Sequence, residues 1–201
     1  MFALIDDQQI TKFFSGNRGV TLGDVQYPKS IFSLWSEAER NAIGIYEVTV
    51  DTTNRKDEQW YINTNVSYGV ESNKAVGSYG TATAKAHADT LFTAQDEIDG
   101  LGTEGEVATR GLKYNLIQTV KAQAAGILQD TDWYIVRKAD AGTAVPSAIT
   151  THRAAVRTKA AEQETAITNA ADTPALETLY TYTTTDGVTS RPLGELPRLD
   201  S

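Results

Sequence analysis

The period of the hydrophobic pattern changes near residue 80 of this 201-residue chain. Before that point apolar and polar residues alternate, as in Ile45–Val50, which is typical of half-buried strands. After it, apolar residues recur every three or four positions, which is typical of amphipathic helices. We therefore expect an α+β fold, with a small β-rich N-terminal module over residues 1–80, an extended helical region with a helical hairpin over 81–172, and an extended C-terminal tail over 173–201.

Short strands are expected throughout the N-terminal module. Phe2–Ile5 and Gln9–Phe14 are short apolar stretches. The run Ser15–Gly19 has the glycine and asparagine that tolerate positive φ in a turn, and we therefore predict a hairpin near the start. Residues 45–50 and 60–68 are rich in β-branched and aromatic residues, and we expect them to pair as a long hairpin. Val76–Tyr79 is expected to add an edge strand.

One short helix is expected within this module. Ser36 and Glu39 have the spacing of a capping box, in which each side chain accepts the other's free backbone N–H. Gly44 follows as a C-terminal stop. The spacing predicts a helix of about two turns between them.

Two helices and a loop are expected next. Ala84–Ile98 carries a helical stripe, and a second capping box at Thr103–Glu106 predicts a helix that runs to about Gln129. Residues 130–137 are interpreted as a turn that leads into a short extended stretch. Lys138–Ala144 is small and polar, so we expect a loop.

A further helix is expected to begin at Pro146, because proline is tolerated in the first turn. Asp172–Pro174 is expected to stop it, before an extended tail. The helix carries a heptad-like seam of Ile149, His152, Val156, Ala160, Gln163 and Ile167. This seam is narrow and modestly apolar, so we expect another protein to complete its burial and a partner chain to hold the tail.

Charge and composition exclude several functions. The chain has 26 acidic and 18 basic residues and a formal charge of −8, which disfavours binding to nucleic acid. It has no cysteine, so disulfides, thiolate metal sites and cysteine nucleophiles are excluded. No apolar run is long enough to span a membrane, and the N-terminus lacks the pattern of a signal peptide, so we expect the protein to stay in the cytoplasm where it is synthesised, without membrane association.

No catalytic signature is present. The chain has two histidines, His87 on an expected helix and His152 on the seam, and neither has a carboxylate placed to orient it as a base. Asp130 and Asp132 alone are too few ligands for a metal ion. We therefore expect a protein that is not an enzyme and that binds no cofactor and no metal.

Interaction residues are expected around the second half of the helical region. Trp133 offers a large apolar surface, and Arg137 lies four residues later, where its guanidinium could stack on an aromatic ring or bind an acidic partner. The expected partner interface comprises Trp133, Arg137, Ile149, His152, Val156 and Ile167.

Two stretches resemble proteins of tailed bacteriophages. Leu128–Trp133, with Arg137 and Pro146–Arg157 after it, resembles a helical hairpin near the C-terminus of small phage tail proteins, including tail-fibre assembly proteins and tail assembly chaperones. His152 stands where those proteins usually have tyrosine before the arginine. Tyr27–Pro28 with Trp35–Arg40 and Gly44–Val48 is similar to an N-terminal module common in phage tail-gene clusters.

The resemblance implies a non-enzymatic structural component of a phage tail, located in the virion at the baseplate or tail-fibre junction. Such a protein would attach or brace other tail, fibre or baseplate proteins as a homo- or hetero-oligomer. One alternative is a tail-fibre assembly chaperone that is absent from the mature virion. A third hypothesis is a carbohydrate-binding receptor module that stacks sugars on Trp60, Tyr61 and Tyr68.

Overall fold

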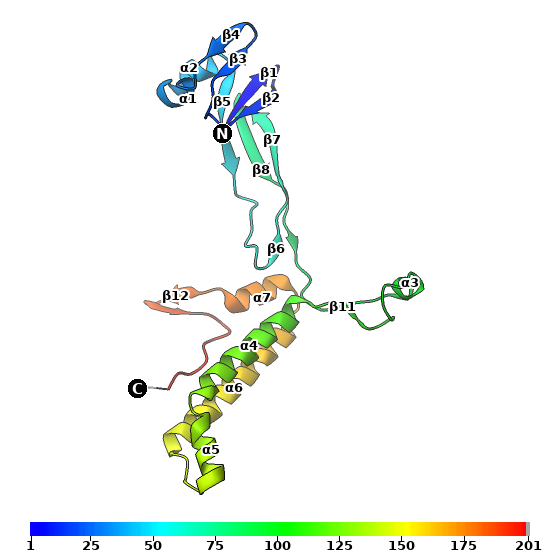
Figure 1. Cartoon of the computed structure of the whole chain (residues 1–201), viewed down its shortest axis with the longest axis vertical. Coiled ribbons are helices and arrows are strands. Elements are labelled where there is room, and N and C mark those ends of the chain that lie inside the picture. The colour runs from blue at the N-terminus through cyan, green and yellow to red at the C-terminus, as the bar shows by residue number, and fades with distance from the viewer. Residues whose placement is uncertain (200–201) are drawn as a thin grey trace. The chain divides into compact units, whose positions relative to one another are not determined.

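The computed structural model describes residues 1–199 and divides the chain into two compact units, one over Met1–Thr83 and one that begins at Ala84. Strands dominate the first unit and helices the second, so the expected α+β class is confirmed. Figure 1 shows the strands of the first unit in blue to cyan and the long helices of the second in green and orange. Each unit is described separately below.

A five-stranded sheet forms the first unit, in the order β2-β1-β5-β8-β7. Its strands are β1 (Phe2–Asp6), β2 (Gln9–Phe14), β5 (Ile45–Asp51), β7 (Val66–Glu71) and β8 (Lys74–Tyr79). β1 and β2 form the expected N-terminal hairpin, but its turn is Asp7–Gln8 and not the glycine- and asparagine-containing run over 15–19 from which the hairpin was predicted. The β5–β8 pairing is parallel, whereas the other three pairings are antiparallel.

This topology corrects two expectations. Residues 45–50 and 60–68 do not form a hairpin, because β5 pairs with β1 and β8, and β7 pairs with β8. Val76–Tyr79 belongs to an internal strand with neighbours on both sides and is no edge. Alternating residues indicate strands, but which strands become neighbours depends on contacts between distant residues.

The core of the first unit lies where the sheet meets two short helices, α1 (Ile31–Leu34) and α2 (Glu37–Asn41). A small hairpin, β3 (Val20–Leu22) and β4 (Val25–Tyr27), joins them. The core residues are Phe14, Val20, Ile31 and Ile45. The predicted capping box of α2 is confirmed: the Glu39 carboxylate accepts the Ser36 backbone N–H at 2.8 Å, and the Ser36 hydroxyl accepts the Glu39 N–H at 3.3 Å.

Two hairpin turns place ordinary side chains in left-handed backbone conformations. Asp7 and Gln8 join β1 to β2 with φ of 45° and 63°, and Ser72 and Asn73 join β7 to β8 with φ of 49° and 58°. Positive φ at both central residues is the geometry of a two-residue type I′ turn, which matches the twist of the strands. The two tips meet, because the Gln8 side-chain amide donates to Asn73 Oδ1 at 2.8 Å.

The second unit begins with an arm, defined here as residues 90–109. It contains β10 (Thr90–Leu91), α3 (Ala94–Ile98) and β11 (Val107–Thr109), and β10 pairs with β11. The short strands β6 (Tyr61–Ile62) and β9 (Thr83–Ala84) precede the arm in the chain. The expected helices over 84–98 and from 103 are therefore wrong in this region, because Ala94–Ile98 is the only helical segment between residues 84 and 111.

Local hydrogen bonds explain the arm. Thr93 and Asp96 form a capping box that begins α3, so the helix cannot extend back through Leu91. Backbone bonds join Phe92 to Glu106 and Gly105, which holds these residues as a hairpin. Alanines at helical spacing fit a helix, but pairing between the two sides of the arm prevails.

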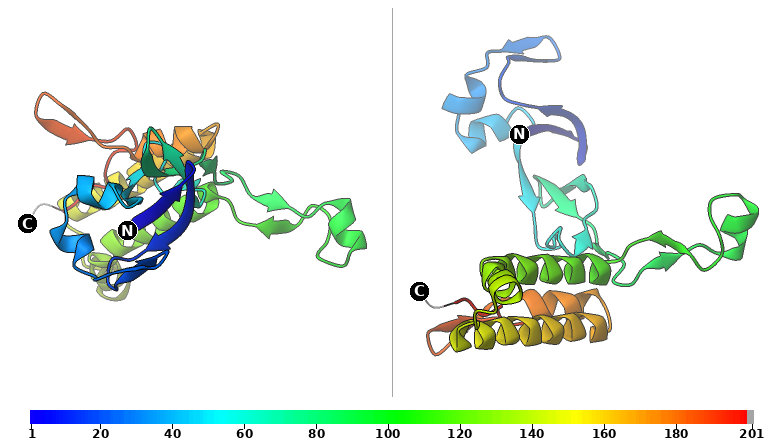
Figure 2. Two further views of the ribbon diagram at one scale, coloured as in Figure 1. Left: turned by 90° about the horizontal axis from the view of Figure 1, so that it is seen from above. Right: turned by 60° about the horizontal axis from the view of Figure 1, so that its bottom comes forward.

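A helical hairpin follows, made of α4 (Leu112–Gln129) and α6 (Ser147–Asn169), which lie side by side in Figure 2. The predicted end of the first helix and the start of the second at Pro146 are confirmed. All six residues of the seam are buried: Ile149, His152, Val156, Ala160, Gln163 and Ile167. α4 packs on α6 and contributes Val120 and Ala124, which are also buried, so the chain covers much of its own seam.

The segment between these helices is itself a helix, α5 (Asp132–Ala141), and the expected extended stretch and loop are corrected. Aromatic and β-branched residues at positions 133–136 have high strand propensity. The helix nevertheless forms, and Gly142 ends it with a left-handed φ of 68°, which glycine adopts without strain.

The C-terminal region is more structured than expected. α7 (Thr173–Tyr180) begins at Asp172, whose carboxylate accepts the Ala175 N–H at 2.8 Å. β12 (Thr183–Thr185) and β13 (Val188–Ser190) form an exposed hairpin. Leu193 is 3% exposed, and its N–H donates to Leu179 O at 3.0 Å, so this chain itself holds the tail at that point.

Candidate functional site

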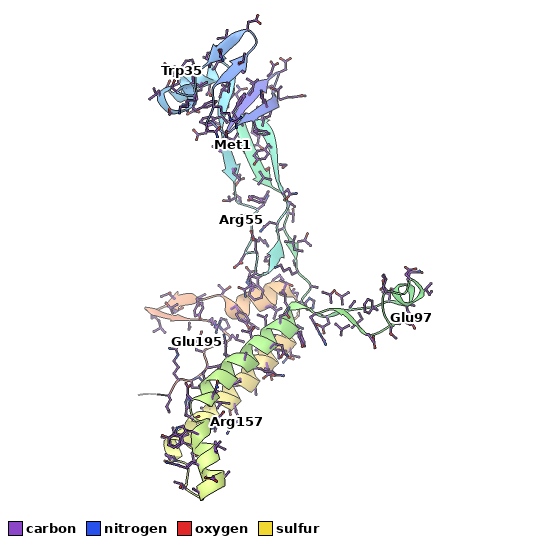
Figure 3. All side chains as sticks on the ribbon, in the orientation of Figure 1. Met1, Trp35, Arg55, Glu97, Arg157 and Glu195 are labelled. Carbon is purple, nitrogen blue, oxygen red and sulfur yellow. The ribbon has the colours of Figure 1, made fainter. Side chains whose placement is uncertain are left out.

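The second unit has a concave surface of about 1240 Å³, called here the C-terminal groove. Residues from α4, α5, α6 and the C-terminal segment line it. They are Gln123, Gly126, Ile127, Asp130, Thr131, Trp133, Tyr134, Ile149, His152, Gln163, Tyr182, Arg191, Glu195, Leu196, Arg198 and Leu199. Figure 3 labels Glu195 on the C-terminal segment.

Aromatic rings and a guanidinium cluster on α5. The rings of Trp133 and Tyr134 are 3.9 Å apart between centroids. The Arg137 guanidinium carbon lies 4.6 Å from the Trp133 centroid and 5.5 Å from the Tyr134 centroid. Trp133 remains 51% exposed, so this cluster offers a large apolar surface together with positive charge.

Arg153 of α6 fixes the position where α4 ends and α5 begins. Its Nη1 donates to Leu128 O and to Thr131 Oγ1, both at 2.7 Å, and lies 2.8 Å from an Asp132 carboxylate oxygen. The Leu128 carbonyl also accepts from the Thr131 N–H at 3.1 Å and the Thr131 hydroxyl at 2.9 Å, so the guanidinium adds a charged donor to the carbonyl that ends α4. Thr131 is buried, so this contact sets the orientation of α5 beside the groove.

The C-terminal segment forms the other side of the groove. Gln163 of α6 donates to Gly194 O at 3.0 Å, which attaches the segment to the hairpin. Arg191 pairs with Glu195 at 2.8 Å and stacks on Tyr182. The Tyr182 hydroxyl donates to Glu195 at 2.5 Å, and this hydrogen bond raises the pKa of the Tyr182 phenol.

The structure separates the six residues of the expected interface into two groups. Trp133 and Arg137 lie together on α5, with Trp133 half exposed. Ile149, His152, Val156 and Ile167 are at most 8% exposed in the chain by itself. These four are packing residues of the hairpin, and their expected place on a surface for another chain is corrected.

Sequence reasoning missed several exposed apolar side chains of this unit. Ile135 and Val136 on α5 are 43% and 65% exposed. In the arm, Leu91, Ile98, Leu101 and Val107 are 49%, 78%, 65% and 36% exposed. The sequence patterns placed Leu91 and Ile98 on the stripe of a helix and residues 133–136 in an extended stretch, and neither assignment identified an exposed apolar surface. The glycines and acidic residues around Ile98 and Leu101 were the signal for an exposed loop in the arm.

His152 lines the groove and is 8% exposed, and the guanidinium of the next residue, Arg153, is bonded to the last turn of α4. Among residues 1–199 no three His, Cys, Asp or Glu side chains are grouped to hold a metal ion. In the same range, no helix is both long enough and apolar enough to cross a membrane.

Comparisons with protein-family models, with curated proteins and with solved structures find no significant match to this chain.

Proposed function

We propose that this chain is a non-enzymatic structural component of a bacteriophage tail, located at the baseplate or tail-fibre junction, where it attaches or braces neighbouring tail proteins. The phage assignment rests on the resemblance of residues 128–157 and 27–48 to phage tail proteins. The structural role rests on an observation about surface area.

The chain exposes more surface than compact proteins of its mass. Its accessible surface is 13159 Å², and its mass is 21.8 kDa. Two compact bodies with the masses of the two units, about 9 and 13 kDa, would together expose about 11,000 Å². The excess of about 2,000 Å² is comparable with the area buried in a specific protein interface. It supports a protein whose surface is completed by neighbours.

Part of this surface is apolar and ordered. α5 exposes Trp133, Ile135 and Val136 within four residues, and the arm exposes Ile98 and Leu101 near its tip. Exposed apolar patches on folded segments mark interaction sites. The carbohydrate-binding alternative loses two of its three stacking residues, because Trp60 and Tyr61 are 3% and 5% exposed, whereas Tyr68 is 42% exposed.

Quantitative mass spectrometry of purified virions tests the proposal. We expect the chain at a fixed copy number relative to the major tail protein of the same particle. Absence from the finished particle, together with loss of fibres when the gene is deleted, would instead establish the tail-fibre assembly chaperone. Virions that do not contain the chain, and that assemble without defect when the gene is deleted, would overturn both hypotheses.

A further inference from the structure

The base of the arm is fixed by an ion pair and hydrogen bonds. Asp89, which precedes the arm, lies 2.6 Å from the guanidinium of Arg110, which follows it. The same carboxylate accepts the Gly111 N–H at 2.8 Å, and the Leu112 N–H donates to Ala86 O at 3.0 Å. The two ends of the arm are therefore joined to each other where α4 begins.

Bonds within the arm order its tip. Thr93 and Asp96 form the capping box that begins α3, and the Leu101 N–H donates to Asp96 O at 2.8 Å. The Phe92 ring covers Gly102 so closely that a Cβ at residue 102 would lie 2.3 Å from a ring carbon, well inside the distance at which two carbon atoms pack. The ring contact and the backbone bonds together hold the shape of the tip.

The arm has no core of its own. None of residues 90–109 is buried, and Ile98 and Leu101 at the tip are 78% and 65% exposed. In Figure 1 the arm, labelled β11 and α3, extends away from α4 and α6. A two-stranded hairpin alone is marginally stable in water, and a specific protein interface uses about 20–30 residues of each partner. The arm therefore has the size and the exposed apolar side chains of one side of an interface.

The arm also carries negative charge that the chain does not compensate. Between residues 90 and 109 there are five acidic residues and no lysine or arginine. The acidic residues are Asp96, Glu97, Asp99, Glu104 and Glu106. Within residues 1–199 none of the five forms an ion pair, and no three His, Cys, Asp or Glu side chains are grouped to hold a metal ion. A binding surface for the arm must therefore combine apolar residues with cationic side chains.

The charge of the arm selects among partners. A second copy of this chain has a formal charge of −8 and the same acidic arm, so electrostatic repulsion opposes its approach. Nucleic acids and anionic lipid surfaces are repelled in the same way. A protein surface with apolar residues bordered by Lys and Arg matches both the apolar tip and the carboxylates of the arm.

We propose that the arm docks in an apolar groove, bordered by Lys and Arg, on a neighbouring protein of different sequence. Ile98 and Leu101 enter the groove. The carboxylates of Glu104 and Glu106, which have no hydrogen-bond or ion-pair partner within residues 1–199, face its cations. Because the arm is ordered before it docks, binding loses little conformational entropy. For the identity of the neighbour, a phage tail protein, this docking rests on the proposed function.

Photo-crosslinking from the arm identifies the surface that it contacts. The photoreactive residue p-benzoylphenylalanine replaces Leu101 in the full-length chain, and crosslinks are mapped by mass spectrometry both in infected cells and in purified virions. We expect one protein to be crosslinked, at a segment where apolar residues adjoin Lys and Arg. The matched control places the same photoreactive residue at Leu34, which is 80% exposed in α1, and it should not crosslink to that segment.

The affinity between the purified full-length chain and the crosslinked protein then separates the apolar from the electrostatic contribution. Ile98→Asp with Leu101→Asp should raise the Kd about tenfold or more. Glu104→Lys with Glu106→Lys should raise it about fivefold or more. This charge variant should also lose less affinity than the wild type when NaCl is raised from about 0.05 M to about 0.5 M, because salt screens the carboxylates from the cations of the partner.

A matched control keeps the net charge of the charge variant and leaves the arm intact. Asp24→Lys with Asp140→Lys changes the net charge by the same amount at two exposed positions outside the arm. This control should bind with an affinity close to that of the wild type. Circular dichroism should show unchanged helix content in every variant.

Any of four results would overturn the docking. They are no protein crosslink from residue 101 in cells or in virions, a crosslink to a second copy of this chain, a crosslinked surface without Lys or Arg, and arm variants that bind with wild-type affinity. The proposed function fails separately. A chain that crosslinks as expected in infected cells but is absent from virions would contradict a virion component and support the docking, whereas a chain present in virions without a crosslink would contradict the docking alone.

Discussion

Val156 tests whether the hairpin is held by its own seam. This side chain is 0% exposed on α6, where the seam packs against α4. Val156→Ala removes two buried methyl groups, which is worth about 1.6 kcal/mol in transfer free energy. The cavity left behind adds to this, so we expect the free energy of unfolding to fall by about 2–3 kcal/mol.

The measurement is urea unfolding followed by circular dichroism at a helix-sensitive wavelength, which reports mainly on the second unit. Val156→Asp should cost more than Val156→Ala, because it buries a carboxylate without a partner. Ala155→Asp is the matched control, since residue 155 is exposed and precedes Val156 directly. Equal unfolding midpoints for Val156→Ala and the wild type, or equal losses for the two aspartate variants, would refute the packing argument.

Three further predictions concern the second unit and the junction. Arg153→Met removes the donor to Leu128 O and should lower the free energy of unfolding by about 1.5–3 kcal/mol in the same titration, because this bond comes from a charged group; an unchanged midpoint would contradict it. The Gly111 N–H and Arg110 lower the pKa of the Asp89 carboxyl below 3.8, so the stability it adds is fully present above that pH and is lost as pH falls through the lower folded pKa. The amide hydrogen of Gly111 should exchange faster as pH falls through that range, after correction for the intrinsic exchange rate. In Asp89→Asn, which has no carboxylate to protonate at this position, the corrected exchange rate should not change over the same range. Limited digestion with a nonspecific protease should cut near Thr83, where the two units meet, and a digest with no cut between about residues 70 and 105 would argue against that boundary.

Some local signals in the sequence predicted local structure. The Ser36–Glu39 spacing predicted α2, because both halves of a capping box lie within one turn, but the same spacing at Thr103–Glu106 begins no helix. Pro146 predicted the start of α6, because proline lacks the N–H that has no partner in the first turn. The 3.6-residue period predicted which face of α6 is buried.

Contacts between distant residues could not be predicted in the same way. Alternation indicated β5 and β8, but their parallel pairing depends on residues separated by about a third of the first unit. Residues 133–136 have strand propensity and yet form a helix, since Arg153, far along the chain, fixes the start of α5. The groove was missed entirely, because its lining comes from four segments spread between Gln123 and Leu199.

The two type I′ turns of the first unit have a consequence for how its sequence can evolve. A left-handed conformation costs a residue with a side chain about 1 kcal/mol or more, whereas glycine adopts it freely. The third such turn, between β12 and β13, uses the favourable Asp186–Gly187 pair, but the turn at Asp7–Gln8 does not. Gln8→Gly would relieve this strain, but it would also remove the hydrogen bond from Gln8 to Asn73 that joins the two tips. The side chain at position 8 is therefore kept for a contact between hairpins at the cost of a strained turn, and a lineage that lost Asn73 would be free to gain stability by acquiring glycine there.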